Sequence, residues 1–259
     1  MRVNKLLVLS VALLALAASC VKEELPAESP ADRDKVETSS DEEAERVILK
    51  SLLAGRDTRW TVDDLDIPTL EGEWYGIQSA EELAYLLEFG SIKGEKYRLM
   101  ADVDVASSSI ADKLSGEIGA EPFEDFEFDG NGKTIANLET RGVDADNPAS
   151  GVFAYAEGAT VKNLTLSGRT NIGSYGIVGG LIGLAKNCTV TNCHLTGSEL
   201  SATVNICGGL IAETEGGTIT GCTISNSKIS NTKNYAGGIV GYAGVQPVIE
   251  NCQILSGTE

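Results

Sequence analysis

The sequence predicts an all-β protein, a parallel β-helix (β-solenoid) with coils of about 29 residues, preceded by short amphipathic helices. Three observations lead to this prediction. Glycines recur at a spacing of 29 residues, at Gly151, Gly180, Gly209 and Gly238. An apolar stretch follows each glycine: VFAYA, LIGLA, LIAET and IVGYA. A second block recurs as VKNLTL, VTNCHL, ITGCTI and finally IENCQI, which is displaced by one residue. Its Val, Ile and Thr content, without helical periodicity, favours strands.

Composition narrows the possible functions. The chain has 259 residues, of which 42% are hydrophobic but only 5% aromatic, so small aliphatic side chains are expected to fill the core. A net charge of -18 argues against nucleic-acid binding and against electrostatic attachment to a membrane surface. His194 is the only histidine, which excludes HExxH zinc chemistry and every His-dependent triad except one built on His194.

The N-terminus has the pattern of a bacterial lipoprotein signal. Arg2 and Lys5 precede an apolar run at 6–16, and the small residues 17–19 lead directly to Cys20. The run is too short, and wrongly flanked, for a membrane span. This arrangement resembles a lipobox, which implies cleavage before Cys20 and acylation of Cys20 with palmitate or similar chains. Two or more chains anchor a protein stably in outer-membrane lipid. The alternative is ordinary signal cleavage, with Cys20 incidental.

A charged segment follows the expected anchor. Lys22, Glu23 and Glu24 resemble the surface-export signal of lipoproteins in one group of Gram-negative anaerobes, although a charged run is also common in solvated segments. Residues 21–45 contain ten acidic residues and no aromatic residue, which predicts a disordered tether. The expected location is therefore the bacterial outer membrane, with the protein facing the exterior.

Two helices and a strand are predicted before the repeats. Capping-box pairs start the helices at Ser40 with Glu43 and at Ser79 with Glu82, and glycines end them at Gly55 and Gly90. The apolar stripes are Val47, Ile48, Leu52 and Leu53 in the first helix, and Leu83, Leu86 and Leu87 in the second. The second helix is expected to cap the first coil. Residues 96–105 then alternate as one strand, with Asp102 and Asp104 on its solvated face; calcium binding there is the less favoured alternative.

Each second block contains a residue suited to a sharp corner: Asn137, Asn163, Asn192, Gly221 and Asn251. Asn and Gly tolerate left-handed backbone angles, so we expect a one-residue corner between two strands at each position. Stacked Asn side chains would form a hydrogen-bonded ladder that Gly221 interrupts. The residues after the corners should point inward: Leu138, Leu164, Cys193, Cys222 and Cys252.

The stacked cysteines are interpreted first as small apolar core residues. A disulfide and a metal site are the alternatives, and Cys188 and Cys207, which lie off the stack, are the better disulfide candidates. Asp129-Gly130-Asn131-Gly132 is expected to form a tight turn rather than a calcium or phosphate loop.

These repeats resemble the GLUG-motif family. The motifs that carry the resemblance are GGLIG (179–183), GGLIA (208–212) and GGIVG (237–241). FDGNGKTIANL (128–138) and the preceding helix-then-strand pair look like the usual leader, so the resemblance spans roughly 74–259. It implies a right-handed parallel β-helix. Such repeats occur in bacterial surface adhesin-like proteins and in the non-catalytic part of immunoglobulin A peptidases, and they imply no particular ligand.

The favoured function is a lipid-anchored, surface-exposed binding or adhesion module, adhesin-like and not an enzyme, with a host protein or glycan as ligand. No catalytic, cofactor or metal residue is predicted. One alternative is a carbohydrate-active β-helix enzyme such as a polysaccharide lyase or hydrolase, which needs clustered carboxylates, whereas the acids here are scattered. The other is the non-catalytic N-terminal part of a surface peptidase.

The predicted organisation is a signal peptide at 1–19, an acidic tether at 20–45, a helix-and-strand leader at 46–110, and the parallel β-helix at 111–259. No cap follows Ile254, so the last coil would expose its edge. Self-association or downstream repeats are therefore expected to cover it.

Overall fold

The computed structural model describes residues 43–54, 59–114, 116–117, 123–141, 148–173 and 176–259. The chain forms two compact units, Met1–Asp63 and Asp64–Glu259. The signal segment, most of the tether and the Ser40 cap lie outside the described residues. In the first unit a helix spans 43–53, as predicted, and Arg46 pairs with Asp63 at 2.6 Å. Its expected stripe is wrong in part, because Val47 is 60% exposed and Leu49 is the buried residue.

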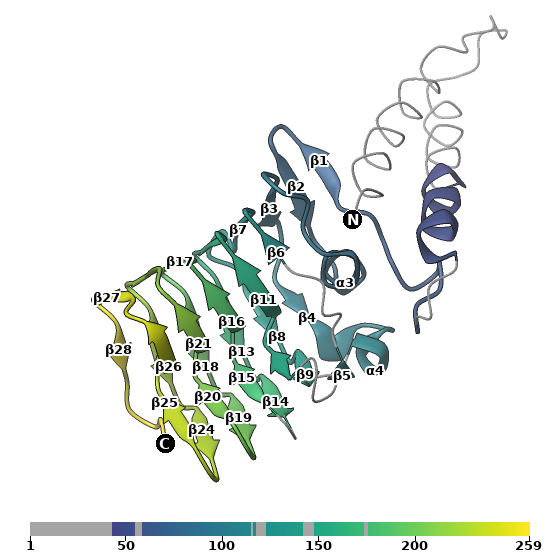
Figure 1. The fold of residues 1–259 in the computed structure, drawn as a ribbon. Helices are drawn as coiled ribbons and strands as arrows, with labels where there is room; N and C mark the ends of the chain where they lie inside the picture. The colour runs from purple at the N-terminus through teal and green to yellow at the C-terminus, as the bar shows by residue number, and fades with distance from the viewer. Residues whose placement is uncertain (1–42, 55–58, 115, 118–122, 142–147, 174–175) are drawn as a thin grey trace, which may run out of the picture. The chain divides into compact units, whose positions relative to one another are not determined.

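The second unit is a stack of parallel coils, and this confirms the predicted β-solenoid (Figure 1). Each full coil contributes one strand to each of five sheets, named I to V here in chain order. Sheet I contains β1 (Thr69–Glu71), β2 (Trp74–Ile77), β3 (Lys96–Leu99), β7 (Glu127–Asp129), β12 (Thr160–Lys162), β17 (Thr189–Thr191), β22 (Thr218–Thr220) and β27 (Val248–Glu250). Sheet II contains β4 (Val103–Asp104), β8 (Thr134–Ala136), β13 (Thr165–Ser167), β18 (His194–Thr196), β23 (Thr223–Ser225) and β28 (Gln253–Ile254).

The other three sheets complete each coil. Sheet III contains β5 (Gly116–Glu117), β9 (Glu139–Arg141), β14 (Thr170–Gly173), β19 (Glu199–Ala202) and β24 (Lys228–Asn231). Sheet IV contains β10 (Ala149–Ser150), β15 (Ile177–Gly179), β20 (Ile206–Gly208) and β25 (Tyr235–Gly237). Sheet V contains β6 (Phe123–Glu124), β11 (Phe153–Glu157), β16 (Ile182–Lys186), β21 (Ile211–Glu215) and β26 (Val240–Val245). The pairing of β1 with β2 is antiparallel, and the other described pairings are parallel.

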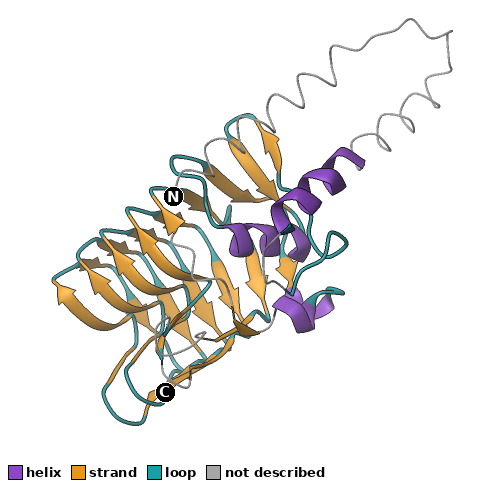
Figure 2. Cartoon of the chain, turned by 45° about the vertical axis from the view of Figure 1, so that its right-hand side comes forward, coloured by secondary structure: helices purple, strands orange, loops and turns teal. Residues whose placement is uncertain are grey.

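The second predicted helix is present as α3 (Ala80–Phe89) at the N-terminal end of the solenoid (Figures 1 and 2). Half of the capping box forms as predicted, since the Ser79 hydroxyl accepts from the Glu82 backbone N–H at 3.1 Å. The Glu82 carboxylate accepts from the N–H of Gln78, the residue before the N-cap, rather than from that of Ser79. Gly90, with φ of 76°, ends the helix. The predicted apolar stripe of Leu83, Leu86 and Leu87 is buried.

The single strand predicted at 96–105 is wrong. The chain turns after Leu99, so that β3 joins sheet I and β4 joins sheet II. The two Asp residues make hydrogen bonds at this corner: Asp102 accepts from the Thr134 N–H at 2.8 Å, and Asp104 accepts from the Asn137 side chain at 2.8 Å. Because β2 and β3 already pair in parallel, the solenoid begins before the boundary at 111. A 3-10 helix, η1 (Val105–Ser107), and α4 (Ala111–Leu114) follow.

Paired glycines mark the turn from sheet IV to sheet V. A Cβ on Gly179 would lie 1.9 Å from the Ile182 carbonyl oxygen, and the same distance separates a Cβ on Gly208 from the Ile211 oxygen. No side chain fits there, which explains why the glycines recur with the coil. The displaced last block is also explained, because β26 contains a bulge that shifts the pairing from Thr214 with Ala243 to Glu215 with Val245.

The core is aliphatic in the repeats but aromatic in the first coils, contrary to the expectation of a core without aromatic residues. Phe123, Phe126 and Phe128 surround Phe153, with ring centroids 5.0, 5.2 and 5.4 Å from it. All four rings are buried. Further along the solenoid, valine, isoleucine, leucine and cysteine stack in their place.

One buried position is charged. Arg169 follows Gly168 at the corner between sheets II and III and is fully buried. Its Nη2 donates to the Thr140 hydroxyl at 2.7 Å, whereas Nε and Nη1 have no hydrogen-bond partner among the described residues. In the next coils Ser198 and Ser227 are buried at the equivalent position. Burial lowers the pKa of Arg169 to about 9, because desolvation disfavours the charged form.

Candidate functional site

The predicted corners join sheet I to sheet II. Asn163, Asn192, Gly221 and Asn251 take positive φ angles of 53°, 50°, 68° and 54°. In the ladder, the Asn192 side-chain NH2 donates to the Asn163 Oδ1 at 3.4 Å. The Asn163 side-chain NH2 donates in turn to the Asp129 carboxylate at 3.0 Å.

Asn137 lies in a different ladder from the one predicted. It also has a positive φ, of 57°, but its strand β8 pairs with β13, so it stacks beside Gly168 at the next corner along the coil. Leu138, the residue after Asn137, therefore stacks with Arg169, the residue after Gly168, and not with Leu164. In the Asn163 series the equivalent position is Gly130, which begins a tight turn: Lys133 N–H donates to the Gly130 carbonyl at 2.7 Å, with Asn131 and Gly132 at positive φ. The predicted tight turn is confirmed.

Threonine rows cover the outer face of sheet I. Thr160, Thr189 and Thr218 stand opposite one another on β12, β17 and β22. Thr191 and Thr220 form a second row that continues from Lys162. The residues between the two rows, Val161, Val190 and Ile219, point into the core. Hydroxyls in each row therefore repeat at the strand spacing of about 4.8 Å.

Sheet II continues this surface beyond the corner. One row contains Thr165, His194 and Thr223, and the other contains Ser167, Thr196 and Ser225. The His194 Nδ1 lies 2.7 Å from the Thr223 hydroxyl, and the Ser225 hydroxyl donates to the Thr196 oxygen at 3.0 Å. His194 thus lies on the outer face, as predicted. The rows on sheets I and II are called the hydroxyl rows below.

An aromatic and cationic cluster lies at the N-terminal end of the outer face of sheet I. The Arg98 guanidinium carbon is 3.9 Å from the centroid of the Trp74 ring. The Lys96 and Lys162 ammonium groups lie 5.4 and 5.6 Å from the same ring. These are cation–π distances. We call these four residues the Trp74 cluster.

Carboxylates balance the charge of the Trp74 cluster. Glu73 accepts from Lys96 at 2.8 Å, Glu127 from Lys162 at 2.5 Å, and Asp129 from Arg98 at 3.2 Å. Burial alone would raise the pKa of Asp129. Hydrogen bonds from Asn163 and Asn131, with the charge of Lys162, outweigh this and hold the pKa below its usual value. Three cations facing three anions leave a neutral patch of donors and acceptors around an aromatic ring, which suits a polar uncharged ligand.

The sequence did not reveal the Trp74 cluster. Its members come from β2, β3 and β12, and the carboxylates from the segment before β2 and from β7. Lys96 lies opposite Glu127 across the sheet, and Arg98 lies opposite Asp129. These pairs can be predicted only when the strand register of the first coils is known. The one sequence feature that could have drawn attention to Trp74 is the scarcity of aromatic residues, because the chain has only two tryptophans.

The predicted lipidation and export residues, Cys20, Lys22, Glu23 and Glu24, lie outside the described residues.

Sheet V brings two acids onto one face. Glu213 and Glu215 are two residues apart on β21, and both side chains face outward. The pKa of Glu213 is raised, mainly because the carboxyl is partly buried and to a smaller extent because the charge of Glu215 is close. Glu213 also lies in a row between Leu184 and Tyr242, with Tyr155 further along.

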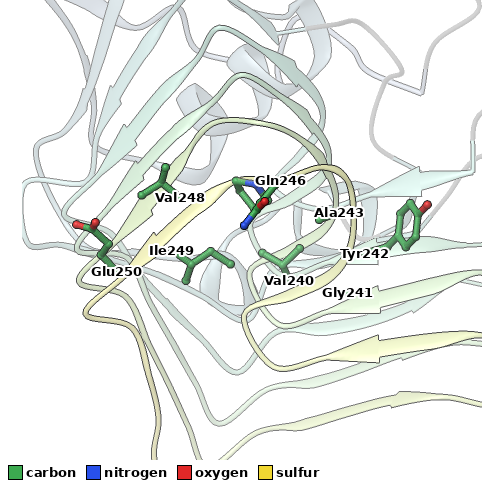
Figure 3. A pocket seen from close by; sticks show the side chains of 9 residues that line it. Val240, Gly241, Tyr242, Ala243, Gln246, Val248, Ile249 and Glu250 are labelled. Carbon is green, nitrogen blue, oxygen red and sulfur yellow. The ribbon is translucent and has the colours of Figure 1, made fainter.

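The last coil has an open edge. Strands β24 to β28 each pair with the preceding coil only. Val248, Ile249, Ile254 and Leu255 are exposed there. A hollow of about 660 Å³ lies within this coil, and Figure 3 shows the Val240 and Ile249 side chains lining it. It is the uncovered interior of the last coil. Coverage of this edge by self-association or downstream repeats stays a prediction.

Two kinds of feature are absent from the described part of the chain. No group of three or more His, Cys, Asp or Glu side chains suited to a metal ion occurs there. Among the same residues, no helix has the length and apolar content needed to cross a membrane.

No protein-family model matches the chain, and no curated protein matches its sequence. Among solved structures, the crystal structure of a candidate immunoglobulin A1 protease from Bacteroides ovatus is similar, with 17% sequence identity and a TM-score of 0.43. The match covers 73% of this chain and 78% of that chain.

Proposed function

We propose that this chain is a lipid-anchored binding module of the GLUG-repeat type, displayed on the outer surface of a bacterial outer membrane, and that it binds a glycan through sheet I. The observation that carries the proposal is the continuous outer face on which the Trp74 cluster adjoins the hydroxyl rows. Hydroxyl groups both donate and accept hydrogen bonds, as sugar hydroxyls do, and an aromatic ring offers an apolar face for a sugar ring. A polar segment of a host protein is the other ligand that this surface suits.

Trp74→Ala is expected to weaken binding to the best ligand of a glycan and host-protein array at least tenfold. The ring supplies the one large apolar surface of the cluster, and truncating such an anchor typically costs about 2 kcal/mol or more in binding. Tyr155→Ala, on sheet V, is the matched control and is expected to bind as the unchanged protein does. Affinities would be measured by calorimetry. Equal affinity in both variants would contradict the assignment of the site to sheet I.

Anchoring and display have separate tests. Cys20→Ala is expected to release the protein from the membrane fraction, because the thiol would carry the acyl chains. Replacing Lys22, Glu23 and Glu24 together with alanine is expected to leave the protein in the membrane fraction but protected from protease added to intact cells. Replacing Asp32, Asp34 and Glu37, acids further along the tether, controls for lost charge and should leave display unchanged. Detergent partitioning that survives Cys20→Ala would count against lipidation.

The Glu213 and Glu215 pair favours a second candidate, a carbohydrate-active enzyme. One carboxyl with a raised pKa beside a second carboxylate is the arrangement in which a general acid and a base can divide their roles. Release of reducing ends from a bound polysaccharide by the purified chain, lost in Glu213→Gln, would favour this candidate over simple binding.

A further inference from the structure

Three cysteines stack in consecutive coils at the inward position after the Asn or Gly corner. Thr191 pairs with Thr220 before the corner and His194 pairs with Thr223 after it, so Cys193 stands opposite Cys222. The pairs Thr220 with Glu250 and Thr223 with Gln253 place Cys222 opposite Cys252 in the same way. Neighbouring strands lie about 4.8 Å apart, within the range of Cα separations that a disulfide bridges.

The three thiols have equivalent surroundings. Each Sγ lies near two carbonyl oxygens, one in its own coil and one in the preceding coil. The distances are 3.5 and 3.7 Å for Cys193, 3.4 and 3.8 Å for Cys222, and 3.4 and 3.6 Å for Cys252. The Cys193 backbone N–H also donates to the Cys222 sulfur at 3.4 Å. The three side chains therefore point the same way along the stack.

The solvent exposure and the pKa of the thiols differ along the stack. Cys193 and Cys222 are buried, whereas Cys252 in the last coil is half-buried. The hydrogen bond from the Cys193 thiol, with a further one from Cys252, outweighs burial and lowers the pKa of Cys222 to about 7. Burial raises the pKa of Cys252. In this structure Cys252 is the accessible thiol of the stack, and the lowered pKa of Cys222 favours its thiolate at neutral pH.

We propose that Cys222 and Cys252 form an oxidation site at which an external disulfide cross-links the last two coils. The Cys252 thiolate attacks one sulfur of the external disulfide, which leaves a mixed disulfide on Cys252 and releases one external thiolate. The Cys222 thiolate then attacks the Cys252 sulfur and releases the second external thiolate. The two protein thiols lose two electrons and two protons, and the external disulfide gains them as two thiols.

This pairing differs from Cys188 with Cys207, which the sequence gives as the better candidates if a disulfide forms. Cys188 and Cys207 are buried at other positions of the coil, on the turn into sheet I and in β20 of sheet IV. Cys188 donates to the Ala156 carbonyl at 3.3 Å, away from the stack. The geometry therefore favours a bridge within the stack, and access favours its C-terminal pair. The inference does not depend on which ligand the hydroxyl rows bind.

The test uses the full chain with Cys20→Ser, reduced and then exposed to glutathione disulfide. A mass loss of about 2 Da, and a cross-linked peptide pair containing Cys222 and Cys252, are expected. Cys222→Ser is expected to accumulate a glutathione adduct on Cys252, because the resolving thiol is missing. Cys252→Ser is expected to form neither cross-link nor adduct at this site, and Cys207→Ser, the matched control, should cross-link as the parent does.

Several outcomes would overturn the proposal: a bridge between Cys193 and Cys222, a bridge through Cys188 or Cys207, or no mass change in the parent. Hydrogen exchange gives a second measurement that does not rely on a cysteine variant. Amides of β27 and β28 are expected to exchange at least tenfold more slowly in the oxidised parent than in the reduced parent, since the cross-link holds the last coil on its neighbour. Equal exchange in the two forms would contradict closure of the bridge at this edge.

Discussion

Leu164→Asp is expected to lower the free energy of unfolding by about 3–5 kcal/mol, the cost of leaving a charge buried without a partner. Leu164 is fully buried directly after the Asn163 corner, and its Cβ packs against Gly130 of the preceding coil. A carboxylate there would be surrounded by aliphatic side chains and the Cys193 position of the next coil. Urea unfolding followed by circular dichroism would measure the loss.

Thr189→Asp provides the control for this substitution. Thr189 is exposed on the outer face of sheet I, so its change should stay within about 0.5 kcal/mol. Lys162, although it also faces outward, is a poor control because it pairs with Glu127 and contacts Trp74. Equal losses for Leu164→Asp and Thr189→Asp would mean that the inside and outside of the coil are wrongly assigned.

Arg169→Met is expected to raise the free energy of unfolding at pH 7 by about 1–4 kcal/mol, by analogy with buried ion pairs that give way to apolar residues of similar volume. Arg169 is fully buried, and its guanidinium has one side-chain hydrogen bond, to Thr140, among the described residues. Methionine would fill the volume without the cost of desolvation. Lys186→Met, on the outer face of sheet V, is the control and should change stability by less than about 1 kcal/mol.

The pH dependence separates this explanation from simple repacking. Burial lowers the pKa of Arg169 to about 9 in the folded chain, well below the value that the guanidinium has in the unfolded chain. Between these values the unfolded chain binds more protons than the folded chain, so the stability of the parent rises with pH. The advantage of Arg169→Met should therefore shrink as the pH rises through about 9. A variant that is less stable than the parent at both pH 7 and pH 10 would show that the Thr140 hydrogen bond outweighs desolvation.

The repeats were predictable because one rule applies to every coil. The residue after each one-residue Asn or Gly corner points inward, and this rule places Leu164, Cys193 and Cys222 correctly. The same rule at Gly168 places Arg169 inside. The sequence hides this position, because the corners between sheets II and III are Gly168, Gly197 and Asn226, which look like ordinary turn residues, and because arginine in a polar stretch suggests a surface position.

The first coils were harder to predict because their spacing differs from the repeat. Phe128 pairs with Val161, 33 residues on, whereas Val161 pairs with Val190, 29 residues on. Ile135 pairs with Leu166, so IANLET lies one sheet later than its likeness to VKNLTL suggests. A corner followed by an inward leucine has the same sequence pattern in either sheet. The Trp74 cluster depends on this altered register, and no local pattern specifies it.

Stacking of coils also determines how the solenoid responds to tension. Strand hydrogen bonds run between coils, and each coil bonds only to its neighbours. A pull on the C-terminal end would therefore detach coils one at a time, starting with the coil that has a neighbour on one side only. Each detached coil of 29 residues would add about 100 Å of extended chain, since a residue spans about 3.4 Å. The chain would lengthen in nearly equal steps and dissipate a sudden load while the remaining coils keep their structure.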